Sequence, residues 1–458
     1  RFLRGCPEIS WTRRCLITGL LDNWITFYDI EKCFDSLWLE DCINSLWTNG
    51  IKDDLLYLIY LMNKRANVTV KTPFGDSLPF LTDCLVKQGT VLGPVLNNCS
   101  LDEFCKEGNA YQYGTVELKS LAFVDDLADL NKGKDEAVKS NHEIVYIQQL
   151  KKLKFSIKKC KVLKINADGK GDATISIEGN KIENKDNFKY LGDIFNNKGD
   201  NSSLCKSRTD RAVGSIIEIF SLSKEAGFGN NEISNLRLLY HSVFLPRLIY
   251  NAEAWSNIID KDIKLLEKSQ LNFLRRMMEV PRSTPIAALY LELGVLPIQF
   301  EIEKRQLCYL KRILDKEIDD PVYLTYKEMM KYDSENNWVN NVFDLRRKYN
   351  LPLNDVNIKN LTPTMWKTMV KRQVKKAAFT LLRNECLSKS KSSHLEFKWF
   401  ASCPYVEKLS PKYARIIFKA RLRMYDIKSN FKGASSVWFL QMYFTNVMYF
   451  NANVFFFL

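Results

Sequence analysis

Runs of apolar residues with different spacings divide the chain into a part that contains strands and a part that is almost entirely helical. Residues 24–30, WITFYDI, form an apolar run typical of a strand, and the run carries Asp29 near its end. Residues 121–130, LAFVDDLADL, place two adjacent acids between apolar runs, which predicts a hairpin with those acids at its tip. From about residue 206 onward, helical patterns such as LRLLYHSVFLPRLIYNAEAW take over. The pattern therefore predicts an α+β fold, with strands and packed helices first and helical regions afterwards.

The same spacing rules predict further elements and a division into domains. We expect helices at 38–50, at 52–65, from Val95 and at 135–154, two strands within 66–86 around a Pro73–Asp76 turn, a strand at 161–166, and a hairpin at 174–183. Composition and pattern change near residues 200 and 335. These changes predict four parts: 1–200, 201–335, 336–435 and an apolar extension at 436–458.

The charge of the chain indicates a polyanionic partner. Its 458 residues include 67 Lys and Arg against 53 Asp and Glu, so the formal net charge is +14 and the pI is about 9.1. This balance favours nucleic acid over a membrane as the partner. The 12 Cys include no CxxC pair, which favours reduced thiols in an intracellular compartment, either nucleus or cytoplasm. The 3 His lack the spacing of a structural zinc site.

The last residues form an uncharged, aromatic-rich segment, 436–458. Its length fits a membrane span, but four polar residues interrupt it: Gln441, Asn446, Asn451 and Asn453. We therefore expect a terminal extension rather than a membrane anchor, and no membrane partner.

The adjacent carboxylates Asp125 and Asp126 need an explanation, because neighbouring like charges repel. Taken alone, LAFVDDLADL is ordinary for an exposed turn between two strands. Asp29, at the tip of another strand, adds a third carboxylate, and metal-dependent phosphoryl transfer needs hard cations held by oxygen ligands. We therefore expect Asp29 to lie near Asp125 and Asp126, on adjacent strands of one antiparallel sheet.

Five segments, in this order, resemble the palm motifs of reverse transcriptases. They are FYDIEKCFDSLW (27–38), KQGTVLGPVL (87–96), LAFVDDLADL (121–130), LKFSIKKCKVLKI (153–165) and FKYLGDIF (188–195). They are similar in style to the polymerases of non-LTR (LINE-type) retrotransposons. LIYNAEAW (248–255) and VPRSTPIAALYLELGVLPIQFEIEKRQL (280–307) also resemble the thumb and post-thumb regions of those elements. The resemblance implies a palm with residual fingers in the first part, a helical thumb and post-thumb region in the second, and a basic helical region in the third.

The resemblance implies roles for the acidic cluster. Asp29 and Asp125 would bind two Mg²⁺ ions, with Mn²⁺ as an alternative, and Asp126 would lie in the same cluster. The backbone carbonyl of Ile30 would be a further metal ligand. Lys159 matches a lysine that donates a proton to the departing pyrophosphate, and a solvated surface lysine is the plain alternative.

The resemblance also implies contacts with the nucleotide and the primer. Phe34 matches the bulky residue that would clash with a ribose 2′-OH and so favour dNTPs, although an aromatic here is also an ordinary core residue. Gln88 and Gly89 would contact the incoming nucleotide or the template strand, and Gly89 suits a close backbone approach. Three residues would form the primer grip: Tyr190, Leu191 and Gly192.

Two functions remain open. The first is an RNA-directed DNA polymerase that extends a DNA primer on an RNA template with dNTPs, without a small-molecule cofactor. The second is a catalytically inactive, nucleic-acid-binding remnant of such a polymerase. The three retained carboxylates favour the first. The short stretch before Asp29, which leaves little room for basic fingers residues, favours the second. The resemblance also implies a piece of such an element, because the sequence shows neither an endonuclease region nor a Cys/His knuckle. We expect a fragment that binds primer–template in a salt-dependent way and extends it barely.

Basic residues gather at helical spacing in two stretches of the C-terminal half, 371–393 and 410–433. Such helix faces can contact phosphates without regard to sequence. A solvated helix face is the alternative, and the sequence does not decide between the two.

Overall fold

An apolar strand lies at the centre of a five-stranded sheet in this computed structural model. The central strand β1 (Asn23–Asp29) pairs antiparallel with β9 (Asp126–Lys132) on one side and with β10 (Lys161–Ile165) on the other. At the edges, β8 (Ser120–Phe123) pairs antiparallel with β9, and β13 (Glu183–Asn184) pairs parallel with β10. The predicted strands are therefore confirmed, and all but one of the strand pairs in this sheet are antiparallel.

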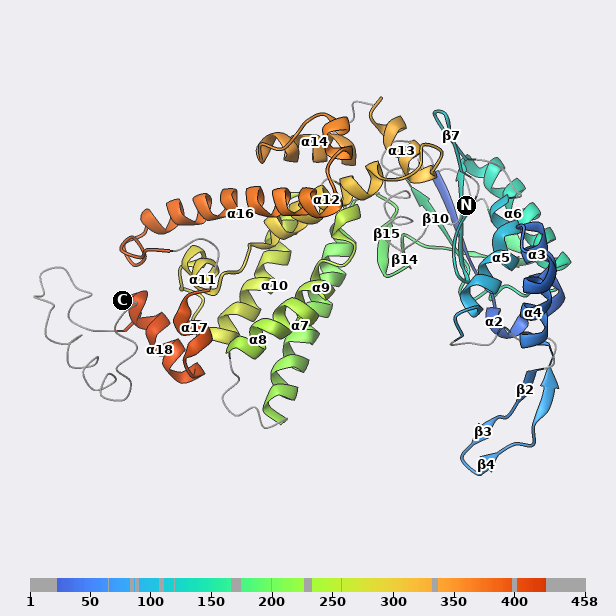
Figure 1. Cartoon of the computed structure of the whole chain (residues 1–458), viewed down its shortest axis with the longest axis horizontal. Coiled ribbons are helices and arrows are strands. Elements are labelled where there is room, and N and C mark those ends of the chain that lie inside the picture. Colours follow the sequence, from blue (N-terminus) through green and yellow to red (C-terminus); the bar gives the residue numbers. More distant parts are fainter. Residues whose placement is uncertain are drawn as a thin grey trace, which may run out of the picture. The chain divides into compact units, whose positions relative to one another are not determined.

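The structure describes most of the chain (Figure 1), and its residues divide into two compact units that are each discontinuous in sequence. The described residues are 23–64, 66–82, 86, 90–106, 111–118, 120–165, 174–198, 200–225, 233–256, 258–331, 337–397 and 402–425. Unit 1 comprises Arg1–Val213, Pro246–Glu267 and Ile298–Val374, and unit 2 comprises Gly214–Leu245, Lys268–Pro297 and Lys375–Leu458. The boundaries predicted near 200 and 335 both fall inside unit 1, and the four-part division remains a prediction.

Helices pack against one face of the central sheet. Side chains alternate between the two faces along a strand, so Trp24, Tyr28 and Leu127 point to the same face and share one apolar core. Helices that contribute to this core are α3 (Leu39–Thr48), α4 (Asp53–Asn63), α5 (Gly93–Lys106) and α6 (Gly133–Leu150). All four were predicted from apolar spacing, and α6 ends four residues earlier than the pattern indicates.

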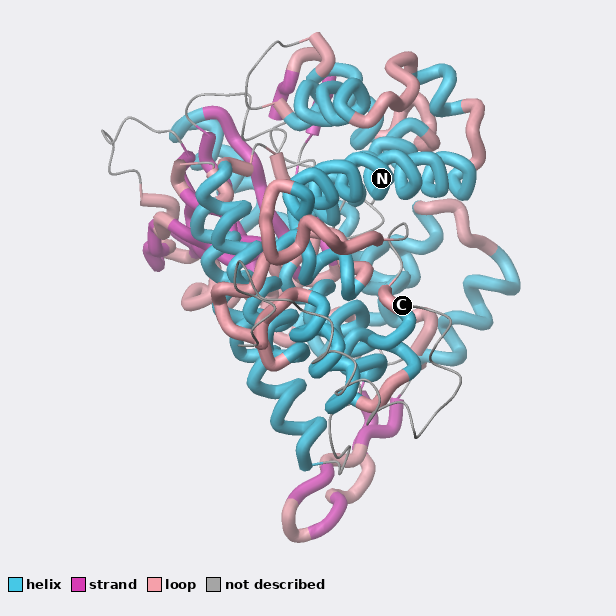
Figure 2. The backbone as a smooth tube through the Cα atoms, turned by 90° about the vertical axis from the view of Figure 1, so that its left-hand side faces the viewer, coloured by secondary structure: helices cyan, strands magenta, loops and turns pink. Residues whose placement is uncertain are grey.

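A long ribbon follows α4. It consists of β2 (Ala66–Val68) paired with β5 (Phe80–Thr82), and of β3 (Lys71–Thr72) paired with β4 (Gly75–Asp76). Figures 1 and 2 show this ribbon projecting from the rest of unit 1 at the bottom of each view. The two strands predicted around the Pro73–Asp76 turn are confirmed, although each is broken into two short pieces.

A second hairpin packs on the opposite face of the central sheet. It is formed by β14 (Asn187–Tyr190) and β15 (Asp193–Asn196). The rings of Phe188 and Tyr190 lie with their centroids 4.2 and 5.3 Å from that of Phe27. Because Phe27 and Asp29 point to the same face of β1, this hairpin lies on the face that carries Asp29. Two further hairpins are described. One pairs β6 (Tyr111–Tyr113) with β7 (Val116–Leu118), and the other pairs β11 (Ser176–Ile177) with β12 (Asn180–Lys181).

Helices make up all regular structure that is described after residue 196. They are α7 (Ser202–Glu225), α8 (Ile233–Leu239), a π-helical turn (Tyr240–Phe244), α9 (Leu245–Leu248), a 3-10 turn (Ala252–Ala254), α10 (Asp260–Met278), α11 (Ile286–Leu293), α12 (Ile298–Leu314), α13 (Pro321–Met329), α14 (Trp338–Lys348), α15 (Asp355–Lys359), α16 (Pro363–Leu387), α17 (Pro404–Lys408) and α18 (Pro411–Arg421). The predicted change from strands to helices is confirmed. Among the described helices, none combines the length and the apolar character that a bilayer crossing requires. The apolar segment 436–458 lies outside the described residues.

An aromatic cluster and a buried amide organise the core of unit 2. The rings of Tyr240, Phe244 and Phe273 contact one another. Gln270 is fully buried; its Nε2 donates to the Tyr240 hydroxyl at 2.7 Å, and its Oε1 accepts from the Tyr290 hydroxyl at 2.8 Å. A buried polar network with its hydrogen bonds made favours a single packing arrangement of these helices.

Candidate active site

Two carboxylates stand opposite each other at the ends of neighbouring strands. Asp29 is the last residue of β1 and Asp126 the first residue of β9, and the antiparallel register pairs them directly. Like charges in such a pair destabilise the strands unless a cation or solvent compensates. The structure thus brings Asp29 and Asp126 together on adjacent antiparallel strands, as the sequence predicts.

Asp125 lies in the two-residue turn that joins β8 to β9. The pair Phe123 and Asp126 closes this turn, and Val124 precedes Asp125 within it. Val124 has a φ of 58°, a left-handed conformation that β-branched residues rarely adopt. Backbone strain of this kind is concentrated at functional sites, where the surrounding structure maintains it. The turn presents Asp125 at the same end of the sheet as Asp29.

The ammonium group of Lys159 lies close enough to all three carboxylates to feel their charge. The Nζ of Lys159 donates to Asp29, at 3.1 Å from Oδ2 and 3.3 Å from Oδ1. This hydrogen bond and the charge of Asp29, with smaller effects of Asp125 and Asp126, raise the pKa of Lys159. The lysine side chain is mostly exposed, so the ion pair itself contributes little to stability. Its position shows that this end of the sheet attracts a cation.

The backbone beside Asp29 offers a further oxygen atom. Ile30 forms an isolated antiparallel bridge with Phe155. The Asp29 carbonyl accepts from the Ser156 amide at 2.8 Å, and the Glu31 amide is the donor on the other side of the bridge. The Ile30 carbonyl takes no part in these two hydrogen bonds. It therefore remains a candidate metal ligand, as the resemblance implies.

The donor set at this site fits a hard divalent cation. Carboxylate and carbonyl oxygens are the ligands that Mg²⁺ and Mn²⁺ prefer. In the part of the chain that the structure describes, no group of three or more His, Cys, Asp or Glu side chains is arranged to hold an ion by itself. Mg²⁺ commonly keeps several waters and binds substrate phosphates beside one or two carboxylates. Asp29 and Asp125 suit that incomplete kind of site, which substrate phosphates would complete.

A buried thiol supports the backbone of Asp29 from behind. The Asp29 amide donates to the Sγ of Cys160 at 3.5 Å, and Cys160 is fully buried. Burial raises the pKa of this thiol to about 11, so it is neutral near pH 7. Cys160 acts as a packed acceptor and not as a thiolate ligand. The sequence analysis missed this residue, and its only signal is its place directly after Lys159.

The predicted nucleotide contacts are described only in part. Phe34 lies on the short helix α2 (Cys33–Ser36), is half-buried, and packs against the core on the helix side of the sheet. Its carbonyl accepts from the Val86 amide at 2.8 Å. Gln88 and Gly89 lie outside the described residues. The roles of all three residues remain predictions.

The predicted primer-grip residues form a turn that contacts the acidic strand. Tyr190 pairs with Asp193, and Leu191 and Gly192 form the two-residue turn between them. The Tyr190 hydroxyl donates to the backbone carbonyl of Asp126 at 2.9 Å. One hydrogen bond therefore joins this hairpin to the strand end that carries the opposed carboxylates.

A fourth aspartate of this region lies on the other face of the sheet. Asp129 is three residues beyond Asp126 on β9, so its side chain points to the helix side, where it is fully buried. Ser120 Oγ and Asn131 Nδ2 donate to its carboxylate at 3.0 and 2.6 Å. Burial raises its pKa to about 6. Asp129 therefore belongs to the core and not to the acidic site.

Comparison with known families identifies the N-terminal part of the chain. Residues 4–195 match the family described as "Reverse transcriptase (RNA-dependent DNA polymerase)". The match contains Asp29, Asp125, Asp126, Lys159 and the turn after Tyr190. These residues are therefore part of a reverse transcriptase domain, whose palm is the antiparallel sheet with its packed helices. Among curated proteins, nothing matches the chain.

Solved structures of telomerases are similar to this chain at low identity. Telomerase from Candida tropicalis in complex with the TWJ fragment of telomeric RNA is 12% identical, with a TM-score of 0.32 over 75% of this chain and 53% of that one. The corresponding complex from Candida albicans is 10% identical, with a TM-score of 0.33 over 79% and 54%. Apo telomerase from Candida tropicalis is 13% identical, with a TM-score of 0.32 over 80% and 56%. The chain spans about half the length of these structures, and TM-scores this low carry no argument about it.

Proposed function

We propose that this chain, whose residues 4–195 form a reverse transcriptase domain, is the RNA-directed DNA polymerase of a non-LTR retrotransposon. It would extend a DNA primer on an RNA template with dNTPs. The observation that carries the proposal is the direct opposition of Asp29 and Asp126, with Asp125 in the adjoining turn. A strand pair that keeps opposed carboxylates at its exposed end is unfavourable without a function that uses their charge.

The acidic site would hold two Mg²⁺ ions, or Mn²⁺, through Asp29, Asp125, Asp126 and the Ile30 carbonyl. When bound, such ions acidify the primer 3′-hydroxyl and neutralise charge that develops on the pyrophosphate. Asp29 would exchange its ion pair with Lys159 for this ligation. Lys159 is an exposed lysine and is therefore protonated at neutral pH, so it would act as the proton donor to the leaving group.

The neighbouring residues would position the substrates. Phe34, half-buried on α2, would exclude a 2′-hydroxyl and so favour dNTPs. Gln88 and Gly89 would contact the nucleotide or the template. The turn after Tyr190 would hold the primer terminus, and the hydrogen bond from Tyr190 to the Asp126 carbonyl supports this placement beside the acidic site.

The helical remainder would hold the nucleic acid. We assign the palm to residues 1–200, the thumb and post-thumb region to 201–335, and a basic helical region to 336–435. Exposed basic side chains on α16, such as Lys376 and Arg383, support phosphate contacts that do not depend on sequence. A polymerase of this kind would work in the nucleus or the cytoplasm.

A second candidate function is binding of nucleic acid without catalysis. One observation favours it: the exposed basic side chains on α16 can contact phosphates whether or not the acidic site binds a metal ion. In that case the palm would act as a scaffold, and the basic helices would supply the affinity.

Primer extension with the 458-residue chain separates these candidates. The chain is mixed with an RNA template, a DNA primer, dNTPs and Mg²⁺, and compared with Asp125→Asn and with Asp35→Asn. Asp35 is an exposed carboxylate on α2, which makes it a matched control. Extension that Asp125→Asn abolishes and Asp35→Asn retains supports the polymerase. Binding without extension supports the second candidate, and no binding at low salt contradicts both.

A further inference from the structure

The turn between β14 and β15 has a conformation that its own sequence does not favour. Leu191 and Gly192 have φ values of 47° and 81°, so both central residues are left-handed, as in a type I′ turn. Glycine adopts this conformation freely, but leucine does so at a cost, because its Cβ crowds the backbone. Surrounding residues must therefore hold the turn in place.

Two residues from a later part of unit 1 hold both carbonyls of this turn. Arg208 on α7 donates from Nη2 to the Gly192 carbonyl at 2.8 Å, and the Tyr250 hydroxyl donates to the Leu191 carbonyl at 3.4 Å. The guanidinium carbon of Arg208 lies 4.8 Å from the centre of the Tyr250 ring, so the two donors also contact each other. A Cβ on Gly192 would lie 3.1 Å from the Tyr250 ring, so a larger residue would press on that ring and would also be strained by the positive φ.

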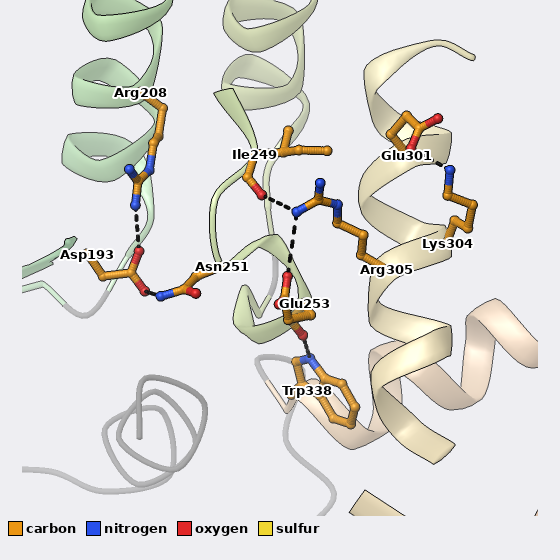
Figure 3. A network of polar contacts seen from close by, with 9 residues as sticks. All are labelled: Asp193, Arg208, Ile249, Asn251, Glu253, Glu301, Lys304, Arg305 and Trp338. Atoms are coloured by element: carbon orange, nitrogen blue, oxygen red, sulfur yellow. Dashed lines mark hydrogen bonds and ion pairs between the residues drawn. The ribbon is translucent and has the colours of Figure 1, made fainter. Parts of the chain in front are cut away.

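A buried ion pair fixes the direction of Arg208. The same Nη2 donates to Asp193 Oδ1 at 3.0 Å, and Asn251 Nδ2 donates to Asp193 Oδ2 at 3.4 Å (Figure 3). The side chains of Arg208 and Asp193 are only 4% and 0% exposed. A buried ion pair is weak evidence for stability, because desolvation offsets its attraction, but it does restrict geometry. The pair thus aims Arg208 at the carbonyl of Gly192.

The segment that carries Tyr250 and Asn251 is itself tied to the helices behind it. Arg305 on α12 donates to the Ile249 carbonyl at 3.0 Å, and the Trp338 indole on α14 donates to the Glu253 carbonyl at 2.9 Å (Figure 3). This segment is LIYNAEAW, which resembles the thumb and post-thumb regions but for which the sequence predicts no individual residue roles. Its backbone is held at two points, so it offers a fixed support to the turn.

We infer that Arg208 and Tyr250 are positioning residues, which hold the Leu191–Gly192 turn where it can grip the primer terminus beside Asp126. The inference rests on the proposed polymerase function and deepens it. These contacts form a connected series. Tyr250 of the LIYNAEAW segment and Arg208 of α7 bind the turn, and the Tyr190 hydroxyl binds the Asp126 carbonyl. Both residues would act through the turn, whose carbonyls they contact, and not on the reacting atoms.

Two conservative substitutions test this role. Arg208→Lys keeps a positive charge for Asp193, but it loses the longer, planar guanidinium whose Nη2 reaches the Gly192 carbonyl and whose face contacts the Tyr250 ring. Tyr250→Phe keeps the ring and removes only the hydroxyl. Arg346→Lys is the matched control, because Arg346 is equally buried in unit 1 and donates to the Pro352 carbonyl and to Asp355 at 2.8 and 2.9 Å.

The measurement is binding of the 458-residue chain to two labelled duplexes, followed by fluorescence anisotropy without dNTPs. One duplex has a recessed primer 3′ end, and the other is blunt and of the same length. The wild type should prefer the recessed end. Arg208→Lys should reduce this preference on the order of tenfold, the worth of one charge-assisted hydrogen bond, and Tyr250→Phe by less. Binding to the blunt duplex should not change.

Melting curves of the same proteins separate positioning from plain stability. Arg346→Lys should lower the melting temperature and keep the preference for the recessed end. If Arg208→Lys behaves in the same way as this control, the pair is merely structural and the inference is wrong. A wild type that binds both duplexes equally overturns the inference and leaves the proposed function standing. A wild type that binds neither duplex contradicts both.

Discussion

Asp29 and Asp126 are direct cross-strand partners at the end of β1 and β9. Two carboxylates in this position repel each other, and the repulsion is relieved in the structure by the ammonium of Lys159 on Asp29. The strand pair therefore gives up some stability to keep negative charge at one point of the sheet. Four predictions follow from this site and from the buried aspartate behind it.

Mg²⁺ should stabilise the folded chain through Asp29. At a Mg²⁺ concentration ten times its Kd, binding to the folded state alone adds about 1.4 kcal/mol to the free energy of unfolding. Asp29→Asn should abolish this response, and without metal it should raise the melting temperature slightly, because it removes the like-charge pair. Thermal melting with and without Mg²⁺ measures both effects. Asp35→Asn should respond as the wild type does; an undiminished response in Asp29→Asn would contradict the site.

Lys159→Met should slow primer extension without unfolding the protein. A positioned proton donor is worth about 100-fold or more in rate, whereas an exposed ion pair contributes little to stability. Single-turnover extension gives the rate, and a melting curve checks the fold. Lys158→Met is the matched control, since Lys158 is an exposed lysine one residue earlier. Equal extension rates for the two variants would show that Lys159 is a solvated surface residue without a role in proton transfer.

Phe34→Val should increase the use of ribonucleotides relative to deoxyribonucleotides. The smaller side chain would leave space for a 2′-hydroxyl, and a single steric contact of this kind is worth on the order of tenfold in discrimination. Competitive incorporation of rNTP and dNTP measures the ratio. Phe34 also packs against the core, so some loss of stability is expected in either case. A lower melting temperature with an unchanged ratio would make Phe34 a core residue only.

Asp129→Asn should stabilise the protein, and more so at pH 7.5 than at pH 4. Burial raises the folded-state pKa of Asp129 from 3.8 to about 6, so its contribution to stability is present below pH 4 and is lost as the pH rises through 6. A shift of this size corresponds to about 3 kcal/mol at most. Among the described residues, nothing donates to the buried Asn131 Oδ1, so a flip of the Asn131 amide would let this oxygen accept from the amide introduced at position 129. Denaturant unfolding across this pH range provides the test, and a gain independent of pH would refute the raised pKa.

The elements of the palm could be predicted because each has a strong local pattern. β1 is a continuous apolar run, and the turn at Val124 and Asp125 interrupts another, so both strands were expected. The sequence predicted that Asp29 lies near Asp125 and Asp126, but not that it pairs directly with Asp126 in the strand register. Strand register depends on which faces become buried, and that is decided by helices packed from elsewhere in the chain.

The supports of the site could not be predicted, because they join distant residues through buried polar contacts. Arg208 and Asn251 look like ordinary helix and loop residues in the sequence, yet both converge on Asp193. Cys160 contacts the Asp29 amide across 131 positions of sequence. No local pattern encodes such contacts. Gln88 and Gly89, which were predicted from their motif, lie outside the described residues.

The order of strands in the central sheet also has a consequence for synthesis on the ribosome. Among the described strands, β1 pairs with β9 and β10, which emerge about 100 and 140 residues after it. Until then its apolar stretch, WITFY, has no strand partner and is open to aggregation or to chaperones. Asp29 therefore reaches its place opposite Asp126 only after the nascent chain has grown well beyond it. Nascent chains cut before residue 126 should leave this strand accessible to protease, and chains that extend past β10 should protect it.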